Sequence, residues 1–194
     1  MKEEIRLAAG RLILRRFDES DIPEIVRLAD DPDISRNTLL IPHPYEELHA
    51  RRWMAVQKRE RRTGKGLVFA VVLVSDRRLL GAVGLTIDRE HNNAGLGYWI
   101  GREFWGRGYA TEAARAVVGY GFEMLGLNKI HGGHFADNGA SGRVMEKIGM
   151  TVEGYQPRHV LRGGKYRDLV LYGILREQWE GLGANRQDMG PSSY

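Results

Sequence analysis

The sequence predicts a single α+β domain built on a mixed, mostly antiparallel sheet. The chain has 194 residues, the usual size of one domain, and no linker rich in proline, glycine and serine divides it. Its hydrophobic pattern switches repeatedly between strand-like and helix-like segments, in the order β-α-α-β-β-β-α-β-α-β-β. We therefore expect about six to seven strands flanked by about four helices in residues 1–180, followed by a flexible tail.

The composition is that of an ordinary globular protein. Hydrophobic residues make up 42% and charged residues 28% of the chain, which excludes wholesale disorder. There is no cysteine, so disulfide scaffolds, thiol nucleophiles and cysteine-based metal sites are excluded. The longest apolar run, at 67–74, is far below the roughly 18 residues of a membrane span. The N-terminus is charged and has no apolar region, so we expect no secretory signal. We expect a cytoplasmic protein with no membrane partner.

The first part of the chain is predicted to contain one strand and one helix before a loop. An aliphatic run at 11–15 indicates the strand. The cap-forming cluster at 18–21 indicates a helix that ends near Ala29. Two prolines make residues 37–44 a loop.

The most basic segment is a predicted helix at 45–62. We expect Leu48, Trp53 and Val56 on its apolar side and the arginines and lysines on a solvated face. RNA binding is the alternative, but it would need aromatic residues among the basic ones on a strand platform, or a recognition helix. Neither pattern is present, so we expect no nucleic-acid partner. The formal charge of +4 is also compatible with an anionic small ligand.

The rest of the chain is predicted to alternate between strands and helices. Runs at 67–74, 79–87 and 94–101 indicate an antiparallel meander, which a glycine-rich loop joins to a helix. The elements from that helix onward are a helix at 109–125, a strand at 129–136, a helix at 140–148, strands at 151–161 and 166–175 joined by a glycine turn at 162–165, and a frayed tail at 181–194.

The glycine-rich loop is the most informative segment. Gly101, Gly106 and Gly108 allow backbone N–H groups to point inward, and the helix that starts after them adds partial positive charge. A phosphate or pyrophosphate is the natural occupant, and Arg107 strengthens the preference for an anion. From this segment alone, a turn that binds nothing stays an alternative.

Two common phosphate-binding loops fit this segment less well. The spacing of Gly101 and Gly106 is that of a P-loop, but Arg107 and Gly108 replace the lysine and hydroxyl residue that hold phosphate and Mg²⁺. A dinucleotide-binding fingerprint would fit Gly106 and Gly108 but not Thr111, and the strands before it form a meander rather than a βαβ unit.

Two segments together resemble the GNAT N-acetyltransferases. They read Trp105-Gly-x-Gly-Tyr-Ala-Thr-Glu-Ala and Asn138-x-x-Ser-x-Arg-Val-x-Glu-Lys-x-Gly, and the similarity runs from about Arg11 to Trp179. They look like the RimJ/RimL branch, the ribosomal-protein N-terminal acetyltransferases and their relatives. The resemblance implies the GNAT fold, acetyl-CoA as co-substrate without a metal, and direct transfer of acetyl to a primary amine.

The resemblance also implies roles for particular residues. The pyrophosphate would sit on the glycine-rich turn, and the strand before it would bind the pantetheine arm through its backbone, where it parts from the strand at 129–136. A main-chain N–H would stabilise the oxyanion, and Asn138 and Ser141 would be catalytic, with Ser141 giving a proton to the thiolate. By sequence alone, Ser141 is equally a helix N-cap. The residues implied to bind acetyl-CoA are Ile100, Gly101, Trp105, Gly106, Arg107, Gly108, Tyr109, Ala110, Thr111, Asn138, Ser141 and Lys147.

Three positions depart from the pattern of the family. Trp105 replaces a frequent glutamine or arginine, so its side chain should not grip phosphate. Met145 replaces a tyrosine acid, which leaves Ser141 as the candidate acid. Gly95 replaces a glutamate, so the general base is not identified; the candidates by proximity are Glu90, His91, His131, His134 and His159. His131 and His134 should point to opposite faces of their strand, which disfavours a shared metal.

The missing glutamate favours an acceptor amine that loses its proton easily. At pH 7 an α-amino group is about 10% neutral, whereas a lysine side chain is below about 0.1% neutral. We therefore expect the N-terminal α-amine of a protein, such as a ribosomal protein, as acceptor. A small amine (antibiotic, polyamine or metabolite) and a non-catalytic acyl-CoA-binding module are the alternatives. The acceptor would enter opposite the CoA, over 37–44 and 162–165, and the protein would be a monomer or a homodimer.

Overall fold

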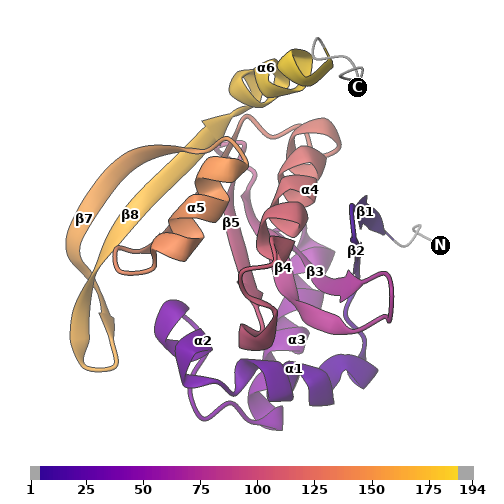
Figure 1. The fold of residues 1–194 in the computed structure, drawn as a ribbon, viewed down its shortest axis with the longest axis vertical. Coiled ribbons are helices and arrows are strands. Elements are labelled where there is room, and N and C mark those ends of the chain that lie inside the picture. The colour runs from indigo at the N-terminus through magenta and orange to yellow at the C-terminus, as the bar shows by residue number, and fades with distance from the viewer. Residues whose placement is uncertain (1–4, 188–194) are drawn as a thin grey trace, which may run out of the picture.

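The computed structural model describes residues 5–187 and shows one sheet with helices on both of its faces (Figure 1). The sheet has eight strands in the order β1-β2-β3-β4-β5-β6-β8-β7. Neighbouring strands are antiparallel except β5 and β6, which are parallel. The predicted α+β class with a mixed sheet is confirmed.

Most of the elements agree with the prediction from sequence. The strands are β1 Leu7–Ala9, β2 Leu12–Arg15, β3 Gly66–Leu73, β4 Leu79–Asp88, β5 Asn93–Ile100, β6 Lys129–Phe135, β7 Thr151–Arg162 and β8 Lys165–Leu175. The helices are α1 Ile22–Ala29, α2 Pro32–Asn37, α3 Glu47–Thr63, α4 Tyr109–Glu123, α5 Gly139–Lys147 and α6 Arg176–Gln187, with short 3-10 turns at Glu19–Asp21 and Arg102–Phe104. The sequence did not predict β1, α2 or α6.

Helix α6 takes up part of the segment predicted to be a frayed tail. Residues 181–187 continue this helix, and residues 188–194 lie outside the described part of the chain. Trp179 packs on Phe122 of α4 with ring centroids 6.0 Å apart, and the Leu182 side chain lies directly over Gly149. These tertiary contacts stabilise a helix whose glycine-containing sequence has low helix propensity.

Helix α3 turns a different side to the core than predicted. Ala50 is fully buried and Trp53 is half-buried, but Leu48 is 51% and Val56 is 40% exposed. The prediction that Leu48 and Val56 lie on the buried side is therefore wrong. This helix has few apolar residues among its charged ones, so the sequence did not define its buried side clearly. The helix comes closest to the core at the small residue Ala50.

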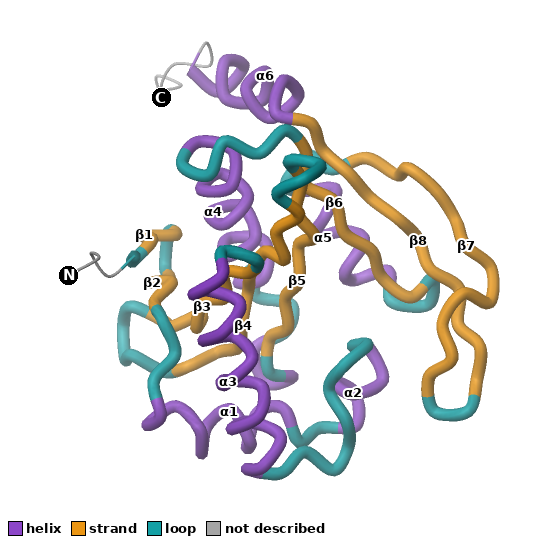
Figure 2. The backbone as a smooth tube through the Cα atoms, turned by 180° about the vertical axis from the view of Figure 1, so that it is seen from behind, coloured by secondary structure: helices purple, strands orange, loops and turns teal. Residues whose placement is uncertain are grey.

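The helices form a layer on each face of the sheet. Helices α4 and α5 lie on the face turned to the viewer in Figure 1, and α1 and α3 lie on the opposite face, seen in Figure 2. Helix α4 buries Ala113, Val117 and Phe122 in the core. This packing fixes the start of α4 beside the end of β5, where the glycine-rich turn lies.

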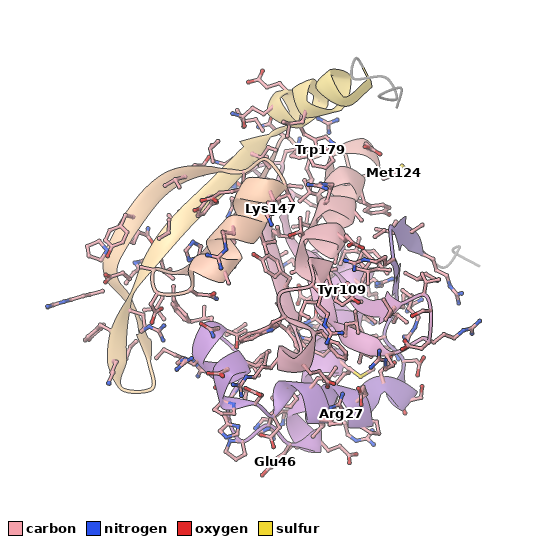
Figure 3. All side chains as sticks on the ribbon, in the orientation of Figure 1. Arg27, Glu46, Tyr109, Met124, Lys147 and Trp179 are labelled. Atoms are coloured by element: carbon pink, nitrogen blue, oxygen red, sulfur yellow. The ribbon has the colours of Figure 1, made fainter. Side chains whose placement is uncertain are left out.

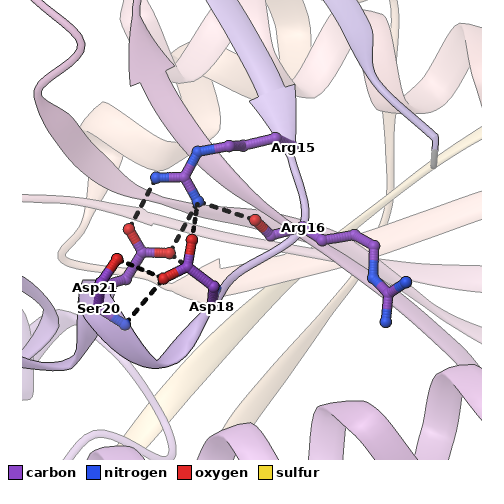
Figure 4. A network of polar contacts seen from close by, with 5 residues as sticks. All are labelled: Arg15, Arg16, Asp18, Ser20 and Asp21. Atoms are coloured by element: carbon purple, nitrogen blue, oxygen red, sulfur yellow. Dashed lines mark hydrogen bonds and ion pairs between the residues drawn. The ribbon is translucent and has the colours of Figure 1, made fainter.

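An ion-pair network sets the entry into α1 (Figure 4). Arg15 at the end of β2 donates two hydrogen bonds of 2.7 Å to the buried carboxylate of Asp21. Asp18 accepts a hydrogen bond of 2.8 Å from the Ser20 N–H and so caps the turn. Such two-point pairing of arginine with carboxylate fixes geometry as well as adding energy. It orients α1, and with it α2, which forms one wall of the site described below.

The central strands β5 and β6 pair over only part of their length. The parallel register joins Asn93, Ala94 and Gly95 to Lys129, Ile130 and His131. Beyond these residues β5 continues to Ile100 and β6 to Phe135, with no further pairing between the two described strands. Backbone groups along this V-shaped opening are available to a ligand, because unpaired N–H and C=O groups need a partner.

Candidate active site

A cavity of about 360 Å³ lies beside the end of β5. Its walls come from β5, the glycine-rich turn, the first turn of α4, helix α5 and helix α2. The volume is within the range of small-molecule and cofactor sites. Of the residues implied to bind acetyl-CoA, the lining includes Ile100, Trp105, Gly106, Gly108, Tyr109, Ala110, Thr111, Asn138, Ser141 and Lys147.

Gly101 and Arg107 are the predicted residues that do not line the cavity. Gly101 is buried, and a Cβ there would lie 2.6 Å from the Leu28 side chain, so this glycine permits close packing. The side chain of Arg107 is exposed, and its carbonyl accepts a hydrogen bond of 2.6 Å from Arg11.

The turn before α4 has the geometry of an anion-binding turn. Gly106 and Gly108 have φ values of 75° and 83°, in the left-handed region that favours glycine. Gly108 is the N-cap of α4, and no side chain caps this helix. The first N–H groups of α4, beginning at Tyr109, are therefore available where the helix adds partial positive charge.

Two cations extend this preference for an anion along the cavity. Arg143 and Lys147 line it from α5, four residues apart and so on the same side of the helix. Figure 3 shows Lys147 on α5 and Tyr109 at the start of α4, on the same face of the sheet. The lining contains no carboxylate. A ligand with phosphate groups and an apolar arm, as in acetyl-CoA, fits this set of groups.

A clamp from the first hairpin supports the turn. The Arg11 backbone N–H and Nε donate to the Glu112 carboxylate at 3.1 and 3.0 Å. The same arginine lies 4.5 Å from the Tyr109 ring centroid. It thus ties the β1–β2 hairpin to both the turn and α4. Sequence reasoning missed this clamp because Arg11 and Glu112 are far apart in the chain.

The Trp105 side chain connects the glycine-rich turn to the end of β5. Its indole N–H donates to the Ile100 carbonyl at 2.6 Å. The side chain therefore braces the end of β5 against the turn, a role that sequence reasoning did not assign to it.

Ser141 lies in the first turn of α5 and contacts Tyr98 of β5. The N-cap of α5 is Asn138, whose side chain accepts from the Ser141 N–H at 3.3 Å, so Ser141 is not the cap. Ser141 Oγ lies 2.7 Å from the Tyr98 hydroxyl. Burial raises the pKa of Tyr98 to about 12. The alternation of side chains along β5, with Leu96 and Ile100 buried, was the signal that could have placed Tyr98 on the α5 side.

None of the candidate bases lines the cavity. Glu90 and His91 are exposed in the β4–β5 turn, and His131 and His159 are exposed on β6 and β7. His134 is 8% exposed, with its ring beneath Gly142 of α5. The side chain of Met145 is buried in the core. Residues 5–187 contain no cluster of three or more side chains suited to a metal, and none of their helices is long and apolar enough to cross a bilayer.

The glycine turn, the uncapped helix start and the V-shaped opening between parallel strands fit a coenzyme A-dependent acyltransferase. The chain belongs to the GNAT family, since the family described as "Acetyltransferase (GNAT) domain" matches residues 11–151. It is therefore an N-acetyltransferase that uses acetyl-CoA as co-substrate. The resemblance found in the sequence is confirmed.

Individual relatives cover nearly the whole chain. The chain is 25% identical to an uncharacterized N-acetyltransferase p20 of Bacillus licheniformis over 90% of its own length and 98% of the relative. It is 25% identical to the ribosomal protein uS5-alanine N-acetyltransferase of Escherichia coli, over 91% and 93% of the two chains. The crystal structure of a GNAT acetyltransferase from Bacillus anthracis superposes with a TM-score of 0.78 at 28% identity, over 89% and 99% of the chains.

Proposed function

We propose that this N-acetyltransferase acts in the cytoplasm, as a member of the RimJ/RimL branch, on the N-terminal α-amine of a protein or peptide. The observation that carries the proposal is that the cavity lining contains neither a carboxylate nor an imidazole to remove a proton from the acceptor. An α-amine, with a pKa near 8, makes the smallest demand on a base among the common biological amines. The relative in Escherichia coli whose name specifies an alanine of protein uS5 supports the same class of acceptor.

The charges around the α2 wall disfavour a polyamine. Asp33 pairs with Arg36 at 2.6 Å and with Arg102 at 3.2 Å. Asp137, next to Asn138, pairs with Arg167. A polyamine needs carboxylates free to bind its several ammonium groups, whereas these carboxylates are already neutralised. A peptide carries one ammonium group at its N-terminus and a neutral backbone after it, which suits this wall.

Asn37 is the polar group of α2 that we assign to the acceptor. It lines the cavity, and its Nδ2 donates to the Asp33 carbonyl at 2.9 Å. This bond turns the side chain so that Oδ1 is the end left for a ligand. A carbonyl oxygen there accepts a hydrogen bond from the incoming amine and orients its lone pair toward the thioester.

The proposed chemistry is direct transfer within the V between β5 and β6. The neutral amine attacks the thioester carbon, a nitrogen–carbon bond forms, and a backbone N–H in the opening stabilises the oxyanion. The carbon–sulfur bond then breaks, Ser141 Oγ gives its proton to the sulfur, the proton lost by nitrogen passes to solvent, and solvent returns a proton to Ser141 Oγ. The absence of cysteine from the chain excludes a thioester intermediate on the protein.

A thiol-release assay with matched acceptors tests this proposal. The purified protein and acetyl-CoA are mixed with peptides that have a free N-terminus, with the same peptides blocked at the N-terminus but carrying lysine, and with spermidine and an aminoglycoside. We expect CoA release with the free N-termini. Faster release with the lysine peptides, spermidine or the aminoglycoside would refute the α-amine proposal while leaving the acetyltransferase activity in place.

A further inference from the structure

The mechanism proposed above gives Tyr98 no role, although its hydroxyl is in direct contact with Ser141. The Tyr98 oxygen lies 2.7 Å from Ser141 Oγ and 3.1 Å from the Ser141 carbonyl oxygen. Both residues line the cavity, Tyr98 from β5 and Ser141 from α5. Their contact thus links the two elements that flank the thioester in the proposed reaction.

The Tyr98 hydroxyl has one proton and two acceptors within reach. The Ser141 carbonyl belongs to helix α5, in which the amide four residues later is its regular partner. The 2.7 Å separation from Oγ is the usual length of a bond between hydroxyl groups, and 3.1 Å is long for such a donor. The bond between the two hydroxyl groups can run in either direction, and Tyr98 is its donor in the arrangement proposed below.

Burial keeps Tyr98 in the donating form. It raises the pKa of the phenol to about 12, and the hydrogen bond with Ser141 offsets only part of that increase. The proton consequently stays on Tyr98 across the pH range of ordinary assays. A phenolate could only accept, and it would draw the Ser141 proton away from the cavity.

We propose that Tyr98 is a positioning residue that directs the Ser141 proton into the cavity, toward the thioester sulfur. Because Oγ accepts from Tyr98, its own O–H bond must point to a different acceptor, and the leaving sulfur supplies one. When the carbon–sulfur bond breaks, the proton moves from Oγ to sulfur. The Tyr98 O–H then stabilises the charge left on Oγ until solvent, which has received the amine proton, returns one. This inference rests on the proposed role of Ser141.

Tyr172 of β8 provides a matched control. Its hydroxyl also connects the sheet to α5, where it donates to Glu146 at 3.1 Å. Tyr172 is 5% exposed and does not line the cavity. The substitution Tyr172→Phe therefore removes a comparable support of α5 without touching Ser141.

The test is the steady-state kinetics of Tyr98→Phe, Ser141→Ala, the double variant and Tyr172→Phe, with acetyl-CoA varied up to saturation at a saturating concentration of a peptide acceptor. We expect Ser141→Ala to lower kcat about 100-fold, as for loss of a general acid. Tyr98→Phe should lower kcat about 5- to 10-fold, the effect of one hydrogen bond, with KM for acetyl-CoA within about 2-fold. When Ser141→Ala is already present, adding Tyr98→Phe should change kcat by less than about 2-fold. Tyr172→Phe alone should also change kcat by less than about 2-fold.

Each other result counts against a defined part of the proposal. An equal loss from Tyr98→Phe in both backgrounds, or the same loss from Tyr172→Phe, would reduce Tyr98 to a structural support. A large loss in Ser141→Ala with none in Tyr98→Phe would overturn the inference about Tyr98 alone. An unchanged kcat in Ser141→Ala would overturn the role proposed for Ser141, and the inference about Tyr98 with it.

Discussion

Replacing Gly142 by alanine should destabilise the protein, although alanine is the better helix former. Gly142 follows Ser141 in α5, and a Cβ there would lie 2.8 Å from His134 Nε2 and 3.2 Å from the Tyr172 hydroxyl. These neighbours have little freedom to move. His134 is 8% exposed and its Nδ1 is hydrogen-bonded to the Phe135 carbonyl at 2.8 Å.

The size of the effect follows from two opposing terms. Forcing a methyl group into a packed site costs about 1–3 kcal/mol, and replacing glycine within a helix returns about 0.5–1 kcal/mol. The net loss for Gly142→Ala is then about 1 kcal/mol, within a range of about 0–2.5 kcal/mol, and a loss of about 1 kcal/mol lowers Tm by roughly 2–4 °C in a chain of this length. Because the first turn of α5 carries Ser141, kcat should fall as well.

Gly139→Ala is the matched control in the same helix. A Cβ at Gly139 would have the flexible end of Arg143, at 3.7 Å, as its nearest neighbour. This variant should keep or slightly raise Tm and keep kcat. Thermal denaturation followed by circular dichroism, with the thiol-release assay, measures both variants. Equal Tm values for Gly142→Ala and Gly139→Ala would refute the packing argument.

The remaining predictions concern the turn, the acceptor and alkaline pH. Gly108→Ala should raise KM for acetyl-CoA about 5- to 30-fold, because the left-handed conformation costs a residue other than glycine about 1–2 kcal/mol. Gly181→Ala is the control, since an added Cβ there meets no other atom, and it should leave KM for acetyl-CoA unchanged. Asn37→Leu should raise KM for the peptide and not for acetyl-CoA; a change confined to acetyl-CoA would remove Asn37 from the acceptor site. Burial raises the pKa of Tyr45 and Tyr98 to about 12, above the unfolded value near 10, so the stability they add below pH 10 should be lost as pH rises toward 12. Urea unfolding measures the free energy of unfolding at pH 8 and at pH 11. Its decrease between these two pH values should be smaller for Tyr98→Phe than for the unchanged protein, and equal decreases would contradict this.

The sequence predicted the order of most elements because their hydrophobic periods and glycine turns are local signals. The glycine-rich turn is an example: Gly106 and Gly108 indicated a phosphate site, and both have the left-handed conformation that such a turn requires. The short helix α2 was missed because six residues are too few for a periodic pattern. Helix α6 was missed because Trp179 stabilises it through tertiary packing, which local propensity does not contain.

The candidate site was only partly predictable for a similar reason. Ser141 and Asn138 stand in a recognisable motif, but the partner of Ser141 is Tyr98, on a different strand. That contact depends on the register of β5 and on the position of α5 over the sheet, neither of which is encoded near Ser141. The position of Asn37 was not predictable either, because it lines the cavity only through the packing of α2 beside that cavity.

The most direct test of the central claim is to let two amines compete in one molecule. A peptide with a free N-terminal alanine and an internal lysine is incubated with the enzyme and acetyl-CoA, and tandem mass spectrometry locates the acetyl group. The account predicts acetylation of the α-amine, and a strong decrease of this product with Ser141→Ala. Acetylation of the lysine side chain, with the α-amine left free, would contradict it.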